Sequence, residues 1–184
     1  HAENADLAKE WIDFMLSDLR AKLEPIGQLD ILDDVGTEAV RYFASLPEER
    51  FTDEELDSRA QSLYQIGRVR IDQGEYTAAV EAIGESLRLA RALVERRPGD
   101  AGLLFGLSQS HFYAGYASYV DGDLDAAEAQ FRDYLRVAEE LVALDPDNVD
   151  YQLELGFAHG NLGSVYEARG NLESAVASFS STLG

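Results

Sequence analysis

Residues 118–131 read SYVDGDLDAAEAQF, an acidic stretch that carries Gly122, Ala127 and Phe131 at fixed places. Two other stretches follow the same pattern, RIDQGEYTAAVEAI at 70–83 and YEARGNLESAVASF at 166–179, so that each copy begins 48 residues after the one before. The same spacing relates a second set of glycines, three alanines and two prolines: Gly67, Gly115 and Gly163; Ala79, Ala127 and Ala175; Pro98 and Pro146. Self-similarity at a fixed period indicates a repeat protein, in which each unit packs on its neighbours.

Two helices are predicted within each period. Asp100 is placed to cap a helix that runs to Gly122, where a glycine in the left-handed conformation can end it. Asp123 can cap the next helix, at about 124–144, whose apolar residues recur at spacings of three and four. Pro146 stops that helix.

The neighbouring copies repeat this pair of helices. In the first copy, Thr52 and Glu55 fit a capping box that opens a helix to residue 72, followed by a partner at 76–96. In the third, Asn148 or Asp150 opens a helix to residue 168, and the second helix is cut off at Gly184. We expect the apolar face of that last helix to be exposed, or packed on a neighbouring molecule, unless the intact protein continues: Leu172, Ala175, Val176, Phe179 and Leu183.

These positions resemble the tetratricopeptide repeat. Counted from Ala60, Ser108 and Gly156, each unit has glycine at positions eight and fifteen, alanine at twenty and a bulky residue at twenty-four. In that family the small residues allow close helix approach and the larger ones fill the gap. The resemblance implies an all-α fold of antiparallel helical hairpins stacked as a right-handed superhelix, an α-solenoid. The family's unit has about 34 residues, so each helix here is longer by about two turns.

The expected domain plan has four parts. Residues 1–50 form a divergent N-terminal hairpin, with helices at 5–23 and 29–46, that caps the stack. Repeats follow at 51–98, 99–146 and 147–184, the last truncated in its second helix. The first hairpin also resembles the segment that precedes such repeats in large bacterial signalling proteins. Since the chain starts at His1 and stops inside a repeat, we expect it to be a piece of a larger protein.

Charge and composition exclude several partners. The chain has 35 acidic and 15 basic residues, a net charge of -20, which repels nucleic acid and anionic lipid. It has no cysteine, so disulfides and thiolate chemistry are absent. No apolar run is long enough for a transmembrane helix, and the N-terminal HAENADLAKE is polar. The compartment stays open: the cytoplasm, or the extramembrane part of an anchored bacterial protein.

The resemblance also implies a concave groove, lined by the first helix of each unit. Carried over to positions two, five, nine and twelve, it points to Gln61, Tyr64, Arg68, Gln109, Phe112, Tyr116, Tyr119 and Phe157. The lysine and asparagine of a carboxylate clamp are missing from these positions. What remains is an aromatic strip beside Arg68, suited to apolar side chains of a peptide or helix. The alternative is that these rings pack between the long helices.

No catalytic, cofactor or metal site is predicted. His111 and His159 occupy the same slot in successive units, and we interpret them as a packed, hydrogen-bonded pair rather than as metal ligands. The DGDLD segment at 121–125 lacks the glycine and glutamate of a calcium loop and is interpreted as helix capping. A basic cluster is expected to form a salt-bridged surface: Arg88, Arg91, Arg96 and Arg97.

The sequence therefore predicts a non-catalytic protein–protein interaction scaffold that binds a peptide or helix in its groove. The alternative is a self-association or regulatory module of a larger signalling protein, with homo-oligomers formed through the exposed C-terminal helix face. Neither interpretation names the partner.

Overall fold

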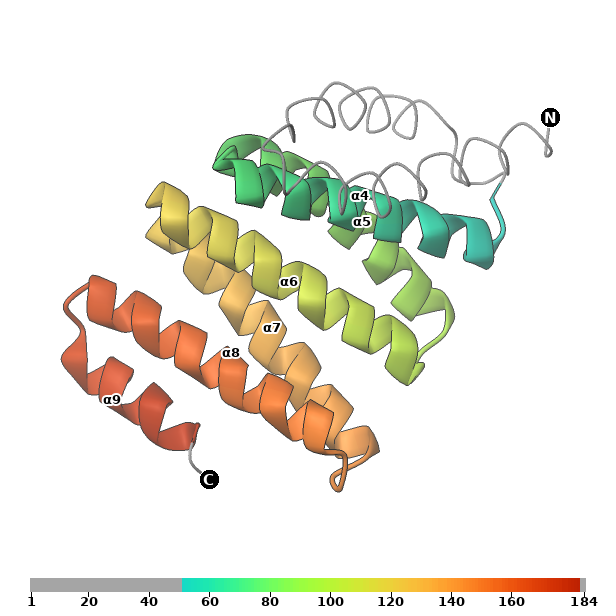
Figure 1. Cartoon of the computed structure of the whole chain (residues 1–184). Coiled ribbons are helices and arrows are strands. Elements are labelled where there is room, and N and C mark those ends of the chain that lie inside the picture. Colours follow the sequence, from blue (N-terminus) through green and yellow to red (C-terminus); the bar gives the residue numbers. More distant parts are fainter. Residues whose placement is uncertain (1–50, 183–184) are drawn as a thin grey trace. The chain divides into compact units, whose positions relative to one another are not determined.

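The computed structural model of the chain describes residues 51–182. Its helices, in chain order, are α4 (Asp53–Gln73), α5 (Tyr76–Arg96), α6 (Ala101–Asp121), α7 (Leu124–Leu144), α8 (Val149–Ala168) and α9 (Leu172–Ser181) (Figure 1). No strand occurs within these residues, in agreement with the all-α prediction. The hairpin predicted at 5–23 and 29–46 lies outside the described range, as does Leu183. Between residues 51 and 182, no helix has both the length and the hydrophobicity needed to cross a membrane.

The helix boundaries repeat with the period of the sequence. The first helices of the three hairpins begin at residues 53, 101 and 149, and the second helices begin at 76, 124 and 172. Both series advance by 48 residues. Helices α4 to α7 have 21 residues each, whereas α9 has 10. The predicted pair of helices per period is therefore confirmed.

Side-chain caps open the first helix of each hairpin. At α4 the Glu55 carboxylate accepts from the Thr52 backbone N–H (2.7 Å), and the Thr52 hydroxyl accepts from the Glu55 backbone N–H (3.3 Å), which confirms the capping box. Asp100 caps α6. Asn148 and Asp150 were alternative caps for α8, and the structure assigns the role to Asn148.

Glycines turn the chain between the two helices of each hairpin. Gly74, Gly122 and Gly170 have φ of 80°, 90° and 73°, a left-handed conformation that glycine adopts without a steric penalty. Asp123 and Asn171 directly follow two of these glycines and cap α7 and α9. The glycine turn predicted at residue 122 is thus confirmed.

A different set of glycines lets the paired helices approach each other. A Cβ atom added to Gly115 on α6 would lie 2.6 Å from the Phe131 ring on α7, far inside normal contact. An added Cβ atom would clash in the same way between Gly67 and Ile83 and between Gly163 and Phe179. The repeated glycine and bulky residue are therefore the two sides of one contact.

The chain divides into two compact units, residues 1–93 and 94–184, and each is described by itself. In the first unit α4 packs against α5. There the Ser86 hydroxyl donates to the Ala60 carbonyl (2.7 Å), and Arg59 Nη2 lies 3.3 Å from Glu85 Oε1. The buried apolar residues of the two helices include Leu56, Leu63, Ile66, Ile83 and Leu87.

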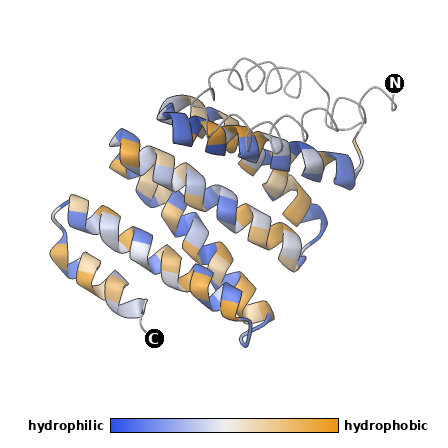
Figure 2. Cartoon of the chain, in the orientation of Figure 1, coloured by the Kyte–Doolittle hydropathy of each residue, from blue (hydrophilic) through white to orange (hydrophobic). Residues whose placement is uncertain are grey.

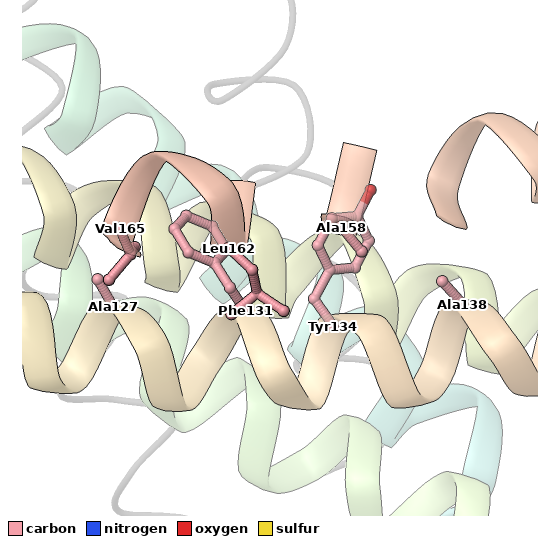
Figure 3. Packing of buried hydrophobic residues seen from close by; sticks show 7 residues of the cluster. All are labelled: Ala127, Phe131, Tyr134, Ala138, Ala158, Leu162 and Val165. Atoms are coloured by element: carbon pink, nitrogen blue, oxygen red, sulfur yellow. The ribbon is translucent and has the colours of Figure 1, made fainter. Parts of the chain in front are cut away.

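In the second unit α7 packs against both α6 and α8, α8 packs against α9, and α6 also contacts α8. Figure 3 shows the buried cluster in which α7 and α8 meet: Ala127, Phe131, Tyr134, Ala138, Ala158, Leu162 and Val165. Apolar residues recur along each helix rather than in one block (Figure 2), as amphipathic helices require. This unit is a stack of antiparallel hairpins, the arrangement predicted for the repeats.

Candidate functional site

Two of the three predicted rings on α6 pack inward. The Phe112 ring is half-buried, with its centroid 5.9 Å from that of Tyr134 on α7. Tyr119 also packs against the cluster between α7 and α8. Tyr116, whose ring stacks on Phe112 at 6.3 Å between centroids, is 40% exposed, and Val120 is 41% exposed. Packing thus accounts for Phe112 and Tyr119, while Tyr116 is open to solvent.

Three apolar side chains on α8 form an exposed stripe. Val149 is 65% exposed, Leu153 51% and Phe157 57%. They are spaced by four residues, which places them on one side of the helix. Of the three, only Phe157 is predicted from the sequence, because the first groove position carried over from the family in this unit is Phe157. The spacing of four was the signal that could have identified Val149 and Leu153.

Gln109, another predicted groove residue, belongs to a buried polar network. Its Nε2 donates to Glu154 Oε2 (2.8 Å), and the Tyr134 hydroxyl donates to the same oxygen (2.6 Å). Glu154 is only 8% exposed, so the network joins α6, α7 and α8 in the interior. Burial, together with the hydrogen bond to Glu154, raises the pKa of Tyr134 well above its ordinary value.

The charges on α6 and α8 are all of one sign. The two helices carry no lysine or arginine, and they have four acidic residues: Asp121, Asp150, Glu154 and Glu167. Glu154 is buried, while the other three are exposed. The exposed apolar side chains of these helices therefore lie in a region of negative potential.

The predicted residues of the first unit lie on α4. Gln61 is exposed and its Nε2 donates to Asp57 Oδ2 (2.9 Å). Tyr64 and Arg68 are half-buried, and the Arg68 guanidinium carbon lies 5.8 Å from the centre of the Tyr64 ring, within the range of a cation–π interaction. The aromatic residue and the cation expected side by side are in contact.

The two histidines differ. His111 is fully buried, and its Nδ1 lies 2.9 Å from Gln130 Oε1, as the interpretation of a packed, hydrogen-bonded residue predicts. His159 is half-buried and makes no hydrogen bond to the described residues, so that interpretation is wrong for the second histidine. Within residues 51–182, no group of three or more histidine, aspartate or glutamate side chains could hold a metal ion.

Ion pairs account for members of the basic cluster. Arg88 donates to Glu85 through Nη2 (2.7 Å) and Nε (2.9 Å), and this hydrogen-bonded pair lowers the pKa of Glu85. Arg97 pairs with Asp100. The salt-bridged surface expected here is confirmed at these two arginines. The DGDLD segment likewise acts as expected, because Asp123 caps α7 through the backbone N–H of Ala126 (3.0 Å).

The last helix leaves apolar side chains exposed. On α9, Leu172 and Val176 are each 65% exposed and Phe179 is 38% exposed, whereas Ala175 is buried. The expected exposure of this face is therefore confirmed except at Ala175, which lies on the inner side of the helix.

A cavity of about 340 Å³ lies between α7, α8 and α9. Its polar lining comes from all three helices, with Arg132, Arg136, Glu139, His159, Tyr166 and Ser178 among the residues. The sequence did not predict this cavity, because no repeat position marks it.

The helical hairpins and their glycine code define a helical-repeat protein. The model of the tetratricopeptide repeat family matches residues 60–93, which start at the Ala60 from which the repeat positions were counted. This match agrees with the resemblance found in the sequence, where two further copies of the same pattern follow in register.

Solved structures of MamA are similar to this chain at low identity. The crystal structure of MamA is 15% identical, with 88% of this chain and 91% of that chain covered and a TM-score of 0.40. MamA MSR-1 C2 is 16% identical, with coverages of 89% and 93% and a TM-score of 0.26. These TM-scores are low, so the superpositions say nothing about what this chain binds. No curated protein sequence matches the chain.

Proposed function

We propose that this chain is a non-catalytic protein interaction scaffold that binds a peptide segment or a helix of a partner protein. The proposed binding surface, called here the α6–α8 face, consists of Tyr116 and Val120 on α6 and of Val149, Leu153 and Phe157 on α8. All five side chains are at least 40% exposed on two helices that contact each other, and this exposure is the observation that carries the proposal. The tetratricopeptide repeat at 60–93 supports a scaffold role in general.

The charge of the face selects the chemistry of the partner. Asp121, Asp150 and Glu167 are exposed on α6 and α8, and neither helix has a basic residue that could offset them. A segment with apolar anchors and basic flanks would satisfy both features, since electrostatic complementarity guides association and apolar anchors hold the complex. Tyr64 and Arg68 on α4 are proposed as a separate contact that belongs to the first unit.

The test uses a pair of model helical peptides, one of leucine and lysine and one of leucine and glutamate, with binding followed by fluorescence anisotropy. We expect the lysine peptide to bind saturably and the glutamate peptide to bind much more weakly. Tyr116→Ala should weaken binding of the lysine peptide about tenfold, because the substitution removes an aromatic anchor. Val176→Ala is the control, because Val176 is also an exposed apolar side chain but lies on α9.

Binding that is lost equally in Tyr116→Ala and Val176→Ala would show that the peptide sticks to any apolar surface. An absence of saturable binding by the lysine peptide would reject the α6–α8 face as a site for helical basic segments.

The second candidate function is self-association through α9, favoured by the exposed Leu172, Val176 and Phe179. The net charge of -20 opposes contact between copies, so association should strengthen as salt screens that charge. Molar mass by light scattering, measured over a concentration series at two salt concentrations, decides between the candidates. If the molar mass stays at that of a single chain under all conditions, self-association is rejected and only the scaffold proposal remains.

A further inference from the structure

The two histidine positions show how the cavity arises. In the second repeat, His111 Nδ1 lies 2.9 Å from Gln130 Oε1 and 4.0 Å from Asp133 Oδ2, and the ring is completely buried. One period later, Ser178 stands in the place of Gln130. Ser181 likewise stands in the place of Asp133.

The two hairpins are otherwise packed alike. A Cβ atom on Gly115 would lie 2.6 Å from Phe131, and a Cβ atom on Gly163 would lie 2.5 Å from Phe179. Because the helices approach equally closely, the difference lies in the side chains. Beyond Cβ, glutamine has a methylene and an amide group where serine has only a hydroxyl, and the cavity of about 340 Å³ includes Ser178 and Ser181 in its lining. Its size is at the small end of the range for ligand pockets, about 300–1,000 Å³.

Each of the three helices brings one hydrogen-bond donor with unused capacity to this cavity. Arg136 on α7 is 59% exposed and has one distant ion-pair contact, from Nε to Asp133 Oδ1 at 3.9 Å, although a guanidinium has five N–H groups. On α8 and α9, the His159 ring and the Ser178 hydroxyl make no hydrogen bond to the described residues. Arginine, imidazole and hydroxyl donors facing one space are suited to an acceptor with several oxygens.

The charged groups that line the cavity favour an anion. Two of them, Arg132 and Arg136, are cationic and one, Glu139, is anionic. Arg132 already donates to Glu128 (2.7 Å) and to the Tyr166 hydroxyl (2.9 Å), so few of its N–H groups are available to a ligand. Arg136 is therefore the cationic side chain of the lining whose donors are least occupied.

We infer that the cavity between α7, α8 and α9 binds a small oxyanion, a phosphate ion or a phosphomonoester group, through Arg136, His159 and Ser178. This site is independent of the α6–α8 face. At the corresponding place in the second repeat, the His111 ring is fully buried and already bonded to Gln130.

The test is a titration of the chain with inorganic phosphate at constant ionic strength, followed by the NMR signals of the histidine rings. The His159 signals should shift and saturate, while those of His111 stay unchanged because its ring is buried and hydrogen-bonded. O-Phosphoserine is titrated in parallel. The ligand that binds more tightly shows whether the site prefers a free phosphate ion or an organic phosphomonoester.

Two variants and one control test the residues. Ser178→Gln supplies the residue of the second repeat, so it should fill the cavity and abolish the His159 shift. Arg136→Gln should weaken binding about tenfold through loss of a charged hydrogen bond. Arg88→Gln removes the arginine at the same position one repeat earlier and should leave binding unchanged.

The site is rejected if His159 shows no saturable shift, if both histidines respond equally, or if Arg136→Gln binds as tightly as the unsubstituted chain. Thermal unfolding of Ser178→Gln checks that the variant folds. Should it be destabilised, Arg136→Gln and its Arg88→Gln control decide the question by themselves.

Discussion

Glycine has two separate purposes in the repeat, and single substitutions distinguish them. Gly122 has φ of 90° and nothing within 4 Å of an added Cβ, so its role is conformational. Gly115 is helical, and its role is to leave space for the ring of Phe131. Gly106, also in α6, has neither a left-handed φ nor a neighbour within 4 Å of an added Cβ.

Gly115→Ala should therefore destabilise the chain. The new methyl group would lie 2.6 Å from a ring that is 1% exposed, so overpacking should lower the free energy of unfolding by about 1–3 kcal/mol. Gly106→Ala, the control in the same helix, should raise it by about 0.5–1 kcal/mol because alanine favours the helix. Urea unfolding measures both. Equal effects of the two substitutions would contradict the role of Gly115 in helix packing.

At the residue scale, what the sequence could predict was local. The caps at Thr52 and Asp100 and the turn at Gly122 depend on backbone geometry within a few residues. The different fates of Phe112 and Tyr116 depend on which side chains α7 places opposite them. His159 resembles His111 in sequence context, but its exposure follows from residues on another helix that no spacing rule on its own helix reveals.

At the scale of elements, a single carboxylate joins three helices of the second unit. Glu154 on α8 accepts from Gln109 on α6 and from the Tyr134 hydroxyl on α7. Buried networks of this kind are stabilising only when each member is satisfied. The ionisation of Tyr134 is therefore coupled to helix packing.

This coupling predicts a loss of stability at high pH. Tyrosine in an unfolded chain ionises near pH about 10. The fold raises the pKa of Tyr134, so its contribution is complete below about pH 10 and is lost as the pH rises further. Tyr134→Phe should be less stable by about 1 kcal/mol at neutral pH, and the difference from the unsubstituted chain should shrink above about pH 10.

Urea unfolding between about pH 8 and about pH 11 measures this change. Tyr119→Phe is the control at neutral pH, since the Tyr119 hydroxyl makes no hydrogen bond to the described residues, and its removal should cost less stability than that of the Tyr134 hydroxyl. A Tyr134→Phe difference that stays constant would show that the network does not respond to ionisation.

Helix positions were predictable at this scale because caps and breakers mark both ends of each helix. The proposed binding surface was harder to predict than the helix ends. The stripe at Val149, Leu153 and Phe157 is visible as a spacing of four, yet an apolar spacing of four also describes a buried side, as at Ala158 and Leu162. Only the positions of the packed helices distinguish the two sides.

At the scale of the whole molecule, charge is the dominant property. The net charge of -20 over 184 residues means that like charges repel one another across the folded chain. Several arginines are already occupied by nearby carboxylates, as Arg88 is by Glu85 and Arg169 by Glu128. The remaining acidic residues have little compensation.

Salt should therefore stabilise this protein. Raising NaCl from about 10 mM to about 150 mM shortens the screening length from about 30 Å to about 8 Å and weakens the repulsion between exposed carboxylates. We expect the melting temperature to rise by a few degrees, as followed by circular dichroism. A fall in melting temperature would mean that the favourable ion pairs outweigh the repulsion.

The strict period of the helix starts has a consequence for how such a chain can change in length. Each of the hairpins described between residues 51 and 182 has its own cap at the start and its own glycine turn, so the 48-residue segment is a self-contained cassette. Removing residues 101–148 would place Asp100 directly before Val149, and an N-capping side chain would again precede a helix. Gain or loss of whole cassettes therefore keeps each cap directly before its helix, whereas a deletion that is not a multiple of 48 residues shifts this register.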